Sequence, residues 1–182
     1  MHRRTFLTST VPILTLSGTA AQPRPARAFV VRAAEDRQGK KLVLAGRAPA
    51  HRKISSRDSA GALFMVEHRD MGKGGPVRHL HLEQDEWFYA IKGEFEVEVG
   101  KELFRLSPGD IVFAPRNVTH TWACVTDTPG TILIGVYPAL TIERFFERLG
   151  ALAKPLEGEG LEKLFADHGM KVMGPPLELR RP

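Results

Sequence analysis

The chain has 182 residues, of which 42% are hydrophobic, and a formal net charge of +5 with a pI near 9.6. Four arginines and no acidic residue fall within residues 1–28, which leaves 22 of the 26 basic residues against all 21 acidic ones. The remainder therefore carries a net charge near +1 and no basic run interleaved with aromatic residues, which argues against nucleic-acid binding. A single cysteine excludes an internal disulfide bond, so stability must come from the core.

Residues 1–28 are predicted to be a cleaved twin-arginine export signal. The arginine pair at 3–4 is followed by Thr-Phe-Leu, by an apolar run over 11–21 and by a small-residue triplet that ends at Ala28. Proline and glycine interrupt the run, which is too short for a spanning helix. We expect cleavage after Ala28, with Ala21 as second choice, and hence a periplasmic protein without a membrane contact. The alternative is a disordered basic N-terminus.

Residues 29–140 are predicted to form an all-β barrel of short antiparallel strands. The first two strands are expected over 41–45 and 61–69. A loop rich in glycine and proline, residues 71–76, then leads into a strand that contains two histidines. This loop either shapes the mouth of a binding site or only connects two strands.

The spacing of the two histidines predicts a metal site. Alternate side chains of an extended strand share a face, so His79 and His81 point to one side and Leu80 to the other. A turn over 83–85 would let the next strand return beside the first and add Glu86 to that side. A buried carboxylate without a partner is costly, so an inward Glu86 requires a cation. Imidazole nitrogen and carboxylate oxygen suit divalent first-row metals.

The strand over 86–91 has two apolar faces. Phe88 and Ala90 share the face of Glu86, whereas the opposite face carries three large apolar residues, Trp87, Tyr89 and Ile91. That outer face indicates either a covered sheet or a homodimer.

Further short strands follow at intervals marked by turn residues. Residues 94–99 alternate strictly between charged and apolar side chains, which is typical of a strand with one face in water. Turn chemistry follows at 107–110. The other expected strands are 103–106, 111–114, 119–125 and 131–136.

Residues 141–182 are predicted to be a helical extension. Apolar residues recur at helical spacing over 141–150, and a second short helix is expected over 161–168, before a tail that contains Gly-Pro-Pro. We expect these helices to cover an open sheet face; a substrate lid is the alternative.

Residues 74–124 resemble the two sequence motifs of the cupin superfamily. The first motif matches Gly74-Gly75-Pro76, His79, His81, Glu86 and Gly93, and the second matches Pro108-Gly109-Asp110, Pro115 and His120. The resemblance implies a jelly-roll barrel, the cupin double-stranded β-helix, with C-terminal helices packed on it. It also implies that His79, His81, Glu86 and His120 hold one divalent transition metal (Fe, Mn, Ni, Cu or Zn). Asn117 and Cys124 depart from the family pattern, and neither is a ligand.

The remaining histidines of the predicted domain are expected to have ordinary roles. His51, His68 and His168 stand singly among polar neighbours, which favours surface or hydrogen-bonded positions. Of these three, His68 is the strongest candidate for a role near the site, because its strand is expected to line the same sheet. Cys124 shares strand parity with His120 and is expected to face inward as a small apolar residue.

Within the superfamily the chain resembles the single-domain, quercetinase-like cupins. This resemblance implies a metal-dependent dioxygenase of a flavonol-like or other enolic or phenolic small molecule, with O2 as co-substrate. Glu86 would be both a ligand and the catalytic proton acceptor. Phe88, Phe113 and Trp122 are candidates for an apolar substrate pocket. The alternatives are a non-catalytic module that binds a metal or small ligand, and a cupin isomerase.

Overall fold

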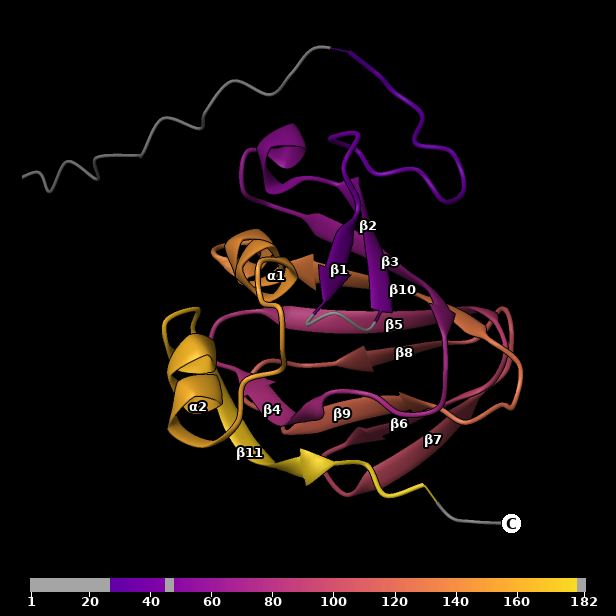
Figure 1. Ribbon diagram of the computed structural model, residues 1–182, viewed down its shortest axis with the longest axis vertical. Coiled ribbons are helices and arrows are strands. Elements are labelled where there is room, and N and C mark those ends of the chain that lie inside the picture. The colour runs from indigo at the N-terminus through magenta and orange to yellow at the C-terminus, as the bar shows by residue number, and fades with distance from the viewer. Residues whose placement is uncertain (1–26, 45–47, 180–182) are drawn as a thin grey trace, which may run out of the picture.

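The computed structural model describes residues 27–44 and 48–179, so residues 1–26 of the predicted export signal lie outside the described part. Two antiparallel sheets face each other (Figure 1). One sheet has six strands in the order β1-β2-β3-β10-β5-β8, and the other has five in the order β11-β4-β9-β6-β7. This arrangement confirms the predicted all-β jelly roll with two helices near its C-terminus.

The strands and helices have the following bounds. The strands are β1 (Leu42–Leu44), β2 (Ala48–Ile54), β3 (Phe64–Met71), β4 (Val77–His81), β5 (Asp85–Lys92), β6 (Phe95–Val99), β7 (Glu102–Leu106), β8 (Ile111–Ala114), β9 (His120–Cys124), β10 (Gly130–Tyr137) and β11 (Met170–Pro176). The helices are a 3-10 turn (Ser56–Ser59), α1 (Ile142–Gly150) and α2 (Gly158–Ala166).

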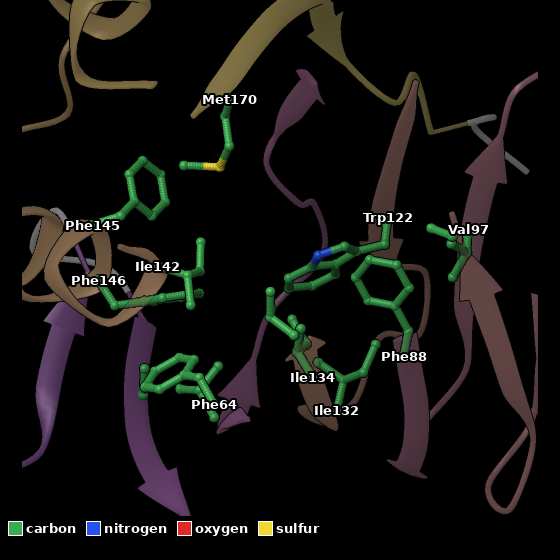
Figure 2. Packing of buried hydrophobic residues seen from close by; sticks show 14 of the residues in the cluster. Phe64, Phe88, Val97, Trp122, Ile132, Ile134, Ile142, Phe145, Phe146 and Met170 are labelled. Atoms are coloured by element: carbon green, nitrogen blue, oxygen red, sulfur yellow. The ribbon is translucent and has the colours of Figure 1, made fainter. Parts of the chain in front are cut away.

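Apolar side chains from both sheets fill the space between them (Figure 2). In β6 the buried Phe95 and Val97 alternate with partly exposed glutamates, as the sequence predicts. Burying a large apolar side chain stabilises the fold by about 1.5–3 kcal/mol. The largest apolar residues that are completely buried are Phe64, Phe88, Phe95, Ile132, Ile134 and Ile142.

The glycine-rich loop before β4 lies against the end of β9. Gly74 and Cys124 exchange two backbone hydrogen bonds of 3.1 and 3.0 Å. A Cβ atom at Gly75 would lie 1.6 Å from the carbonyl oxygen of Trp122, so only glycine allows this close approach. The loop therefore fixes the position from which β4 starts.

The predicted pairing of the histidine strand with the next strand is wrong. β4 pairs with β9 and β11 in one sheet, whereas β5 pairs with β10 and β8 in the other. The turn between β4 and β5 thus carries the chain from one sheet across to the other. Glu86 consequently faces the histidines across the barrel and does not lie beside them in a hairpin.

The C-terminal segment is more than a helical extension. α1 and α2 lie at one end of the two sheets (Figure 1), and β11 then adds a strand to the edge of the five-stranded sheet beyond β4. Both β11 and β2 were absent from the predicted strands. Among the described residues, no helix has the length and apolar character needed to cross a membrane.

Candidate metal centre

Four buried side chains from three strands meet at one point inside the barrel. β4 contributes His79 and His81, and β9 contributes His120, which pairs in register with His79. Glu86, near the start of β5, faces them from the opposite sheet. Their candidate ligand atoms all lie within 4.8 Å of one another. The structure thus brings together the four predicted ligands.

Backbone carbonyls orient two of the imidazole rings. The Nδ1 atom of His79 lies 2.9 Å from the carbonyl oxygen of Val77, and that of His120 lies 3.0 Å from the carbonyl oxygen of Val118. A carbonyl can only accept, so each Nδ1 carries the proton and donates it. Each Nε2 is then left with a free lone pair that points towards the cluster, as a metal ligand requires.

Gln84 orients the third ring. Its Nε2 donates to the carbonyl oxygens of Pro138 and Ala139, at 3.1 and 2.7 Å, which turns its Oε1 towards His81. The Nδ1 atom of His81 donates to that Oε1 over 2.9 Å. The Nε2 atom of His81 is buried and has no hydrogen-bond partner among the described residues. A buried nitrogen without a hydrogen-bond partner fits the role of a metal ligand. The role of Gln84 in orienting this ring was not predicted from the sequence.

Glu86 brings the only carboxylate into the described cluster. Its Oε2 lies 2.8 Å from Nε2 of His120, 3.3 Å from Nε2 of His81 and 4.0 Å from Nε2 of His79. Burial acts to raise the pKa of Glu86, but its close contacts with the imidazoles of His81 and His120 outweigh this effect and hold the pKa well below its usual range. The carboxylate therefore stays ionised.

The pKa values of His79 and His81 shift in opposite directions. Burial, reinforced by the charge of His120, lowers the pKa of His79 to about 3. Burial also acts to lower the pKa of His81, but the negative charge of Glu86 nearby outweighs it and raises this pKa. His79 is therefore a neutral imidazole at physiological pH, which is the form that binds metals.

The residues present fit one first-row divalent ion. Such ions bind imidazole nitrogen and carboxylate oxygen at roughly 2.0–2.2 Å, so neighbouring donors around one ion lie roughly 3–4 Å apart. Three Nε2 atoms and an ionised carboxylate converge there, and among the described residues no lysine or arginine pairs with Glu86. An octahedral ion with these four ligands would keep two positions open.

Of the three predicted pocket residues, Phe88 lies beside the cluster and Trp122 packs against Phe88. The ring of Phe88 is 5.9 Å from that of His120 and 6.5 Å from that of Trp122, and Figure 2 shows Phe88 and Trp122 side by side. The prediction that Phe113 lines the pocket is wrong. Its side chain is 58% exposed on the outer face of the sheet, in register with Trp87.

Helix α2 covers the cluster from one side. The ring of Phe165 packs edge-on against the imidazole of His79, with centroids 5.3 Å apart. Phe165 is itself buried against Phe145 of α1, at 4.9 Å between centroids. The C-terminal helices therefore close the end of the barrel at which the histidines lie, and sequence patterning gave no sign that one of their residues touches a predicted ligand.

The other three histidines are buried, so the surface alternative of the prediction is wrong for them, whereas the hydrogen-bonded alternative holds for His168. His168 donates from Nδ1 to the carbonyl oxygen of Leu164, at 2.8 Å, and is a hydrogen-bonded core residue. His51 and His68 are both buried with ring nitrogens that lack a partner among the described residues. Cys124 is fully buried, as the sequence predicts.

Comparisons with known proteins give a family match over part of the chain and two relatives of known name. Residues 65–136 match the family described as Cupin domain. The chain is similar to quercetin 2,3-dioxygenase of Bacillus subtilis (strain 168), with 29% identity over 109 residues, which cover 59% of this chain and 31% of that protein. It is also similar to quercetin 2,3-dioxygenase of Aspergillus japonicus, with 37% identity over 84 residues, or 43% of this chain and 23% of that protein. The chain thus spans less than a third of either relative.

Two solved structures share the architecture at low sequence identity. KdgF from Halomonas sp. superposes with a TM-score of 0.52 and 20% identity, covering 62% of this chain and 94% of that one. A protein of Thermotoga maritima described as a predicted oxalate decarboxylase gives a TM-score of 0.54 and 15% identity, covering 60% of this chain and 98% of that one. At these identities the likeness concerns the fold alone.

Proposed function

We propose that this chain, whose barrel has the cupin fold and whose residues 65–136 match the Cupin domain family, is a metal-dependent dioxygenase of a flavonol-like or other enolic or phenolic molecule. The observation that carries the proposal is the buried cluster of His79, His81, Glu86 and His120 with its Nε2 atoms turned inward. The similarity to two quercetin 2,3-dioxygenases supports the substrate class and O2 as co-substrate. Location in the periplasm is part of the proposal and rests on the sequence of residues 1–28.

The residues of the chain would have distinct tasks in this reaction. When bound, a divalent ion would supply Lewis acidity and open positions for oxygen-bearing reactants. The recorded contacts of Glu86 with the imidazoles all run through Oε2, so Oε1 is the atom that would accept a proton from a substrate hydroxyl. The buried faces of Phe88 and Trp122 would bind an aromatic ring and exclude water.

The test begins with metal content. The purified protein is analysed for metal, and flavonol absorbance and oxygen uptake are then followed with and without a chelator. We expect uptake that needs the metal and disappears in the double variant His79→Ala, His81→Ala. Circular dichroism of that variant should show a folded barrel without bound metal. A fully metallated protein that consumes no oxygen across a panel of phenols and enediols contradicts the dioxygenase proposal.

The second candidate is a module that binds a metal or small ligand without catalysis. The observation that favours it is the near-complete burial of the cluster beneath Phe165, which leaves the ligands closed in. A purely structural metal site is typically closed in this way, whereas a catalytic site keeps a position open. Metal that raises the melting temperature without supporting oxygen uptake favours this second function.

A further inference from the structure

His68 is a buried polar residue on the inner face of β3. It shares strand parity with the core residues Phe64 and Val66, and only 4% of its surface is exposed. Neither Nδ1 nor Nε2 has a hydrogen-bond partner among the residues that the structure describes. An interior polar group that lacks both partners is rare in folded proteins and costly to keep.

Aromatic residues link His68 to the metal cluster. Its ring lies edge-on to Trp122, with centroids 5.6 Å apart, and 5.8 Å from Phe146 (both labelled in Figure 2). Trp122 contacts Phe88, and Phe88 contacts His120. A series of buried aromatic contacts thus connects His68 to the cluster inside the same barrel.

The ring of His68 is neutral at physiological pH. Burial lowers its pKa to about 4, although the negative charge of Glu86 acts in the opposite direction. A neutral imidazole offers one N–H donor and one acceptor nitrogen. A hydroxyl group has the same two capacities and is therefore a matching partner, whereas a metal cation or a carboxylate could satisfy only one of the two nitrogens.

We propose that His68 binds the small molecule of this site through a hydroxyl group at the end remote from the metal. The proposal rests on the proposed function, and it narrows the substrate class to flat molecules with two polar ends. One end carries the enol oxygens for the metal, and the other carries a hydroxyl for His68. The aromatic body would lie against Trp122 and Phe88, whose buried rings separate the two polar points.

The test is a binding cycle with two flavonols. One has a single hydroxyl on its pendant phenyl ring and the other has none, and dissociation constants are measured with metal-loaded protein by the absorbance change. We expect the wild type to bind the hydroxylated flavonol about tenfold more tightly, which is the effect of one hydrogen bond. His68→Phe should remove this preference without weakening the other flavonol, because it removes the polar partner only.

Two further variants keep the result specific. His51→Phe is the matched control, because His51 pairs with Glu67 and points to the other face of the sheet from His68, and the preference should survive. His68→Gln retains a donor and an acceptor and should retain part of the preference. If His68→Phe does not fold, the nitrogen-15 shifts of the His68 ring in the wild type should move only with the hydroxylated flavonol.

The outcomes separate this inference from the proposed function. A wild type without preference, or a preference that persists in His68→Phe, overturns the role of His68 and leaves an ordered water as its partner. If His68→Phe removes the preference but the protein takes up no oxygen, the role of His68 is supported and the dioxygenase proposal is contradicted. If the protein takes up oxygen but His68→Phe leaves the preference unchanged, only the role of His68 is contradicted. Failure to bind either flavonol overturns both.

Discussion

Gln84 determines which nitrogen of His81 is free. Its amide nitrogen is held by two backbone carbonyls of the loop after β10, so the amide cannot flip without losing both hydrogen bonds. The carbonyl oxygen of the amide then selects the tautomer of His81 in which Nε2 has no proton. Such outer partners orient metal ligands and raise their basicity.

Replacing Gln84 should therefore weaken metal binding without removing a ligand. Gln84→Met keeps the approximate volume but loses the acceptor for His81, and we expect metal affinity to fall by about 10–100-fold. Competition with a chromogenic chelator measures the affinity. Glu83→Gln, a change at the neighbouring exposed residue, is the control and should leave affinity unchanged. Equal affinities for wild type and Gln84→Met would show that Gln84 does not orient the ring.

The orientation of single side chains could be predicted where polar and apolar residues alternate along a strand, and not elsewhere. The parity of His79 and His81 and the inward face of Glu86 follow from strand geometry alone. Residues 111–114 are all apolar, so no alternation marks the inner face, and Phe113 was placed inside. The pairing of β8 with β5 determines the inner face, because the inward Glu86 stands opposite Ala114 and Phe113 therefore points outward. Gln84 could not be foreseen, since its partners lie 54 and 55 residues away.

At the scale of elements, β11 escaped prediction for a physical reason. Glycine and two prolines in 174–176 oppose regular strand pairing, since proline lacks a donor and suits only edge strands. β11 is in fact an edge strand, and its register with β4 shifts on either side of Gly174. The alternating and turn-bounded strands β5, β6 and β7 were predictable because their patterns are local.

The two C-terminal helices are attached to the barrel in different ways. The buried Glu143 of α1 accepts hydrogen bonds from Ser55, Ser56 and Gln38, so α1 is tied to the loop after β2. The recorded side-chain ion pairs near α2 are exposed, and its buried contacts are apolar. Of the two helices, α2 is thus the one that can move away from the cluster at lower cost.

Shortening Phe165 should open the cluster. Phe165→Ala removes the ring that covers His79, so we expect metal to leave faster when a chelator is added. The free energy of unfolding should fall by about 3 kcal/mol, as for other buried phenylalanines. Stopped-flow metal release and urea unfolding measure the two effects.

Leu164→Ala is the matched control for this variant, because it truncates another buried side chain of α2. It should destabilise the protein without the same acceleration of metal release. If both variants release metal equally fast, general loosening of α2 explains the result and Phe165 has no particular covering role.

For the whole molecule, the buried His68 makes stability depend on pH. Its pKa is about 4 in the folded protein against 6.5 for an ordinary histidine, and burial is the main cause. The contribution of His68 to the free energy of unfolding is fully present above pH 6.5. It is lost as the pH falls towards 4, because only the unfolded chain takes up the proton over that range. The loss amounts to about 3 kcal/mol in all.

Urea unfolding of wild type and His68→Phe across this range checks the expectation. The variant cannot bind a proton at this position, so its stability should fall less steeply as the solution becomes more acidic. Contributions of the other buried histidines occur in both proteins and cancel in the difference. Parallel curves would mean that His68 is protonated in the folded state or already has a partner there.

The global architecture was predictable because many short strands with turn residues allow few alternatives. What local patterns could not supply is which sheet each strand joins, since that depends on pairing between distant segments. The outer apolar face is partly explained: Trp87 packs over Gly135, where a Cβ atom would lie 2.0 Å from the indole. Tyr89 and Ile91 remain exposed there, and the homodimer stays a prediction.

The pairing of β11 with β4 sets an order of events during synthesis. β4 meets β9 at the single register pair of His79 with His120, whereas β11 runs along it from His81 to Val77. The strand that presents two ligands is therefore held chiefly by residues 170–176, which leave the ribosome about ninety residues later. A nascent or prematurely terminated chain has the ligands but not their support. Metal loading in this fold consequently requires that residues 170–176 have been translated.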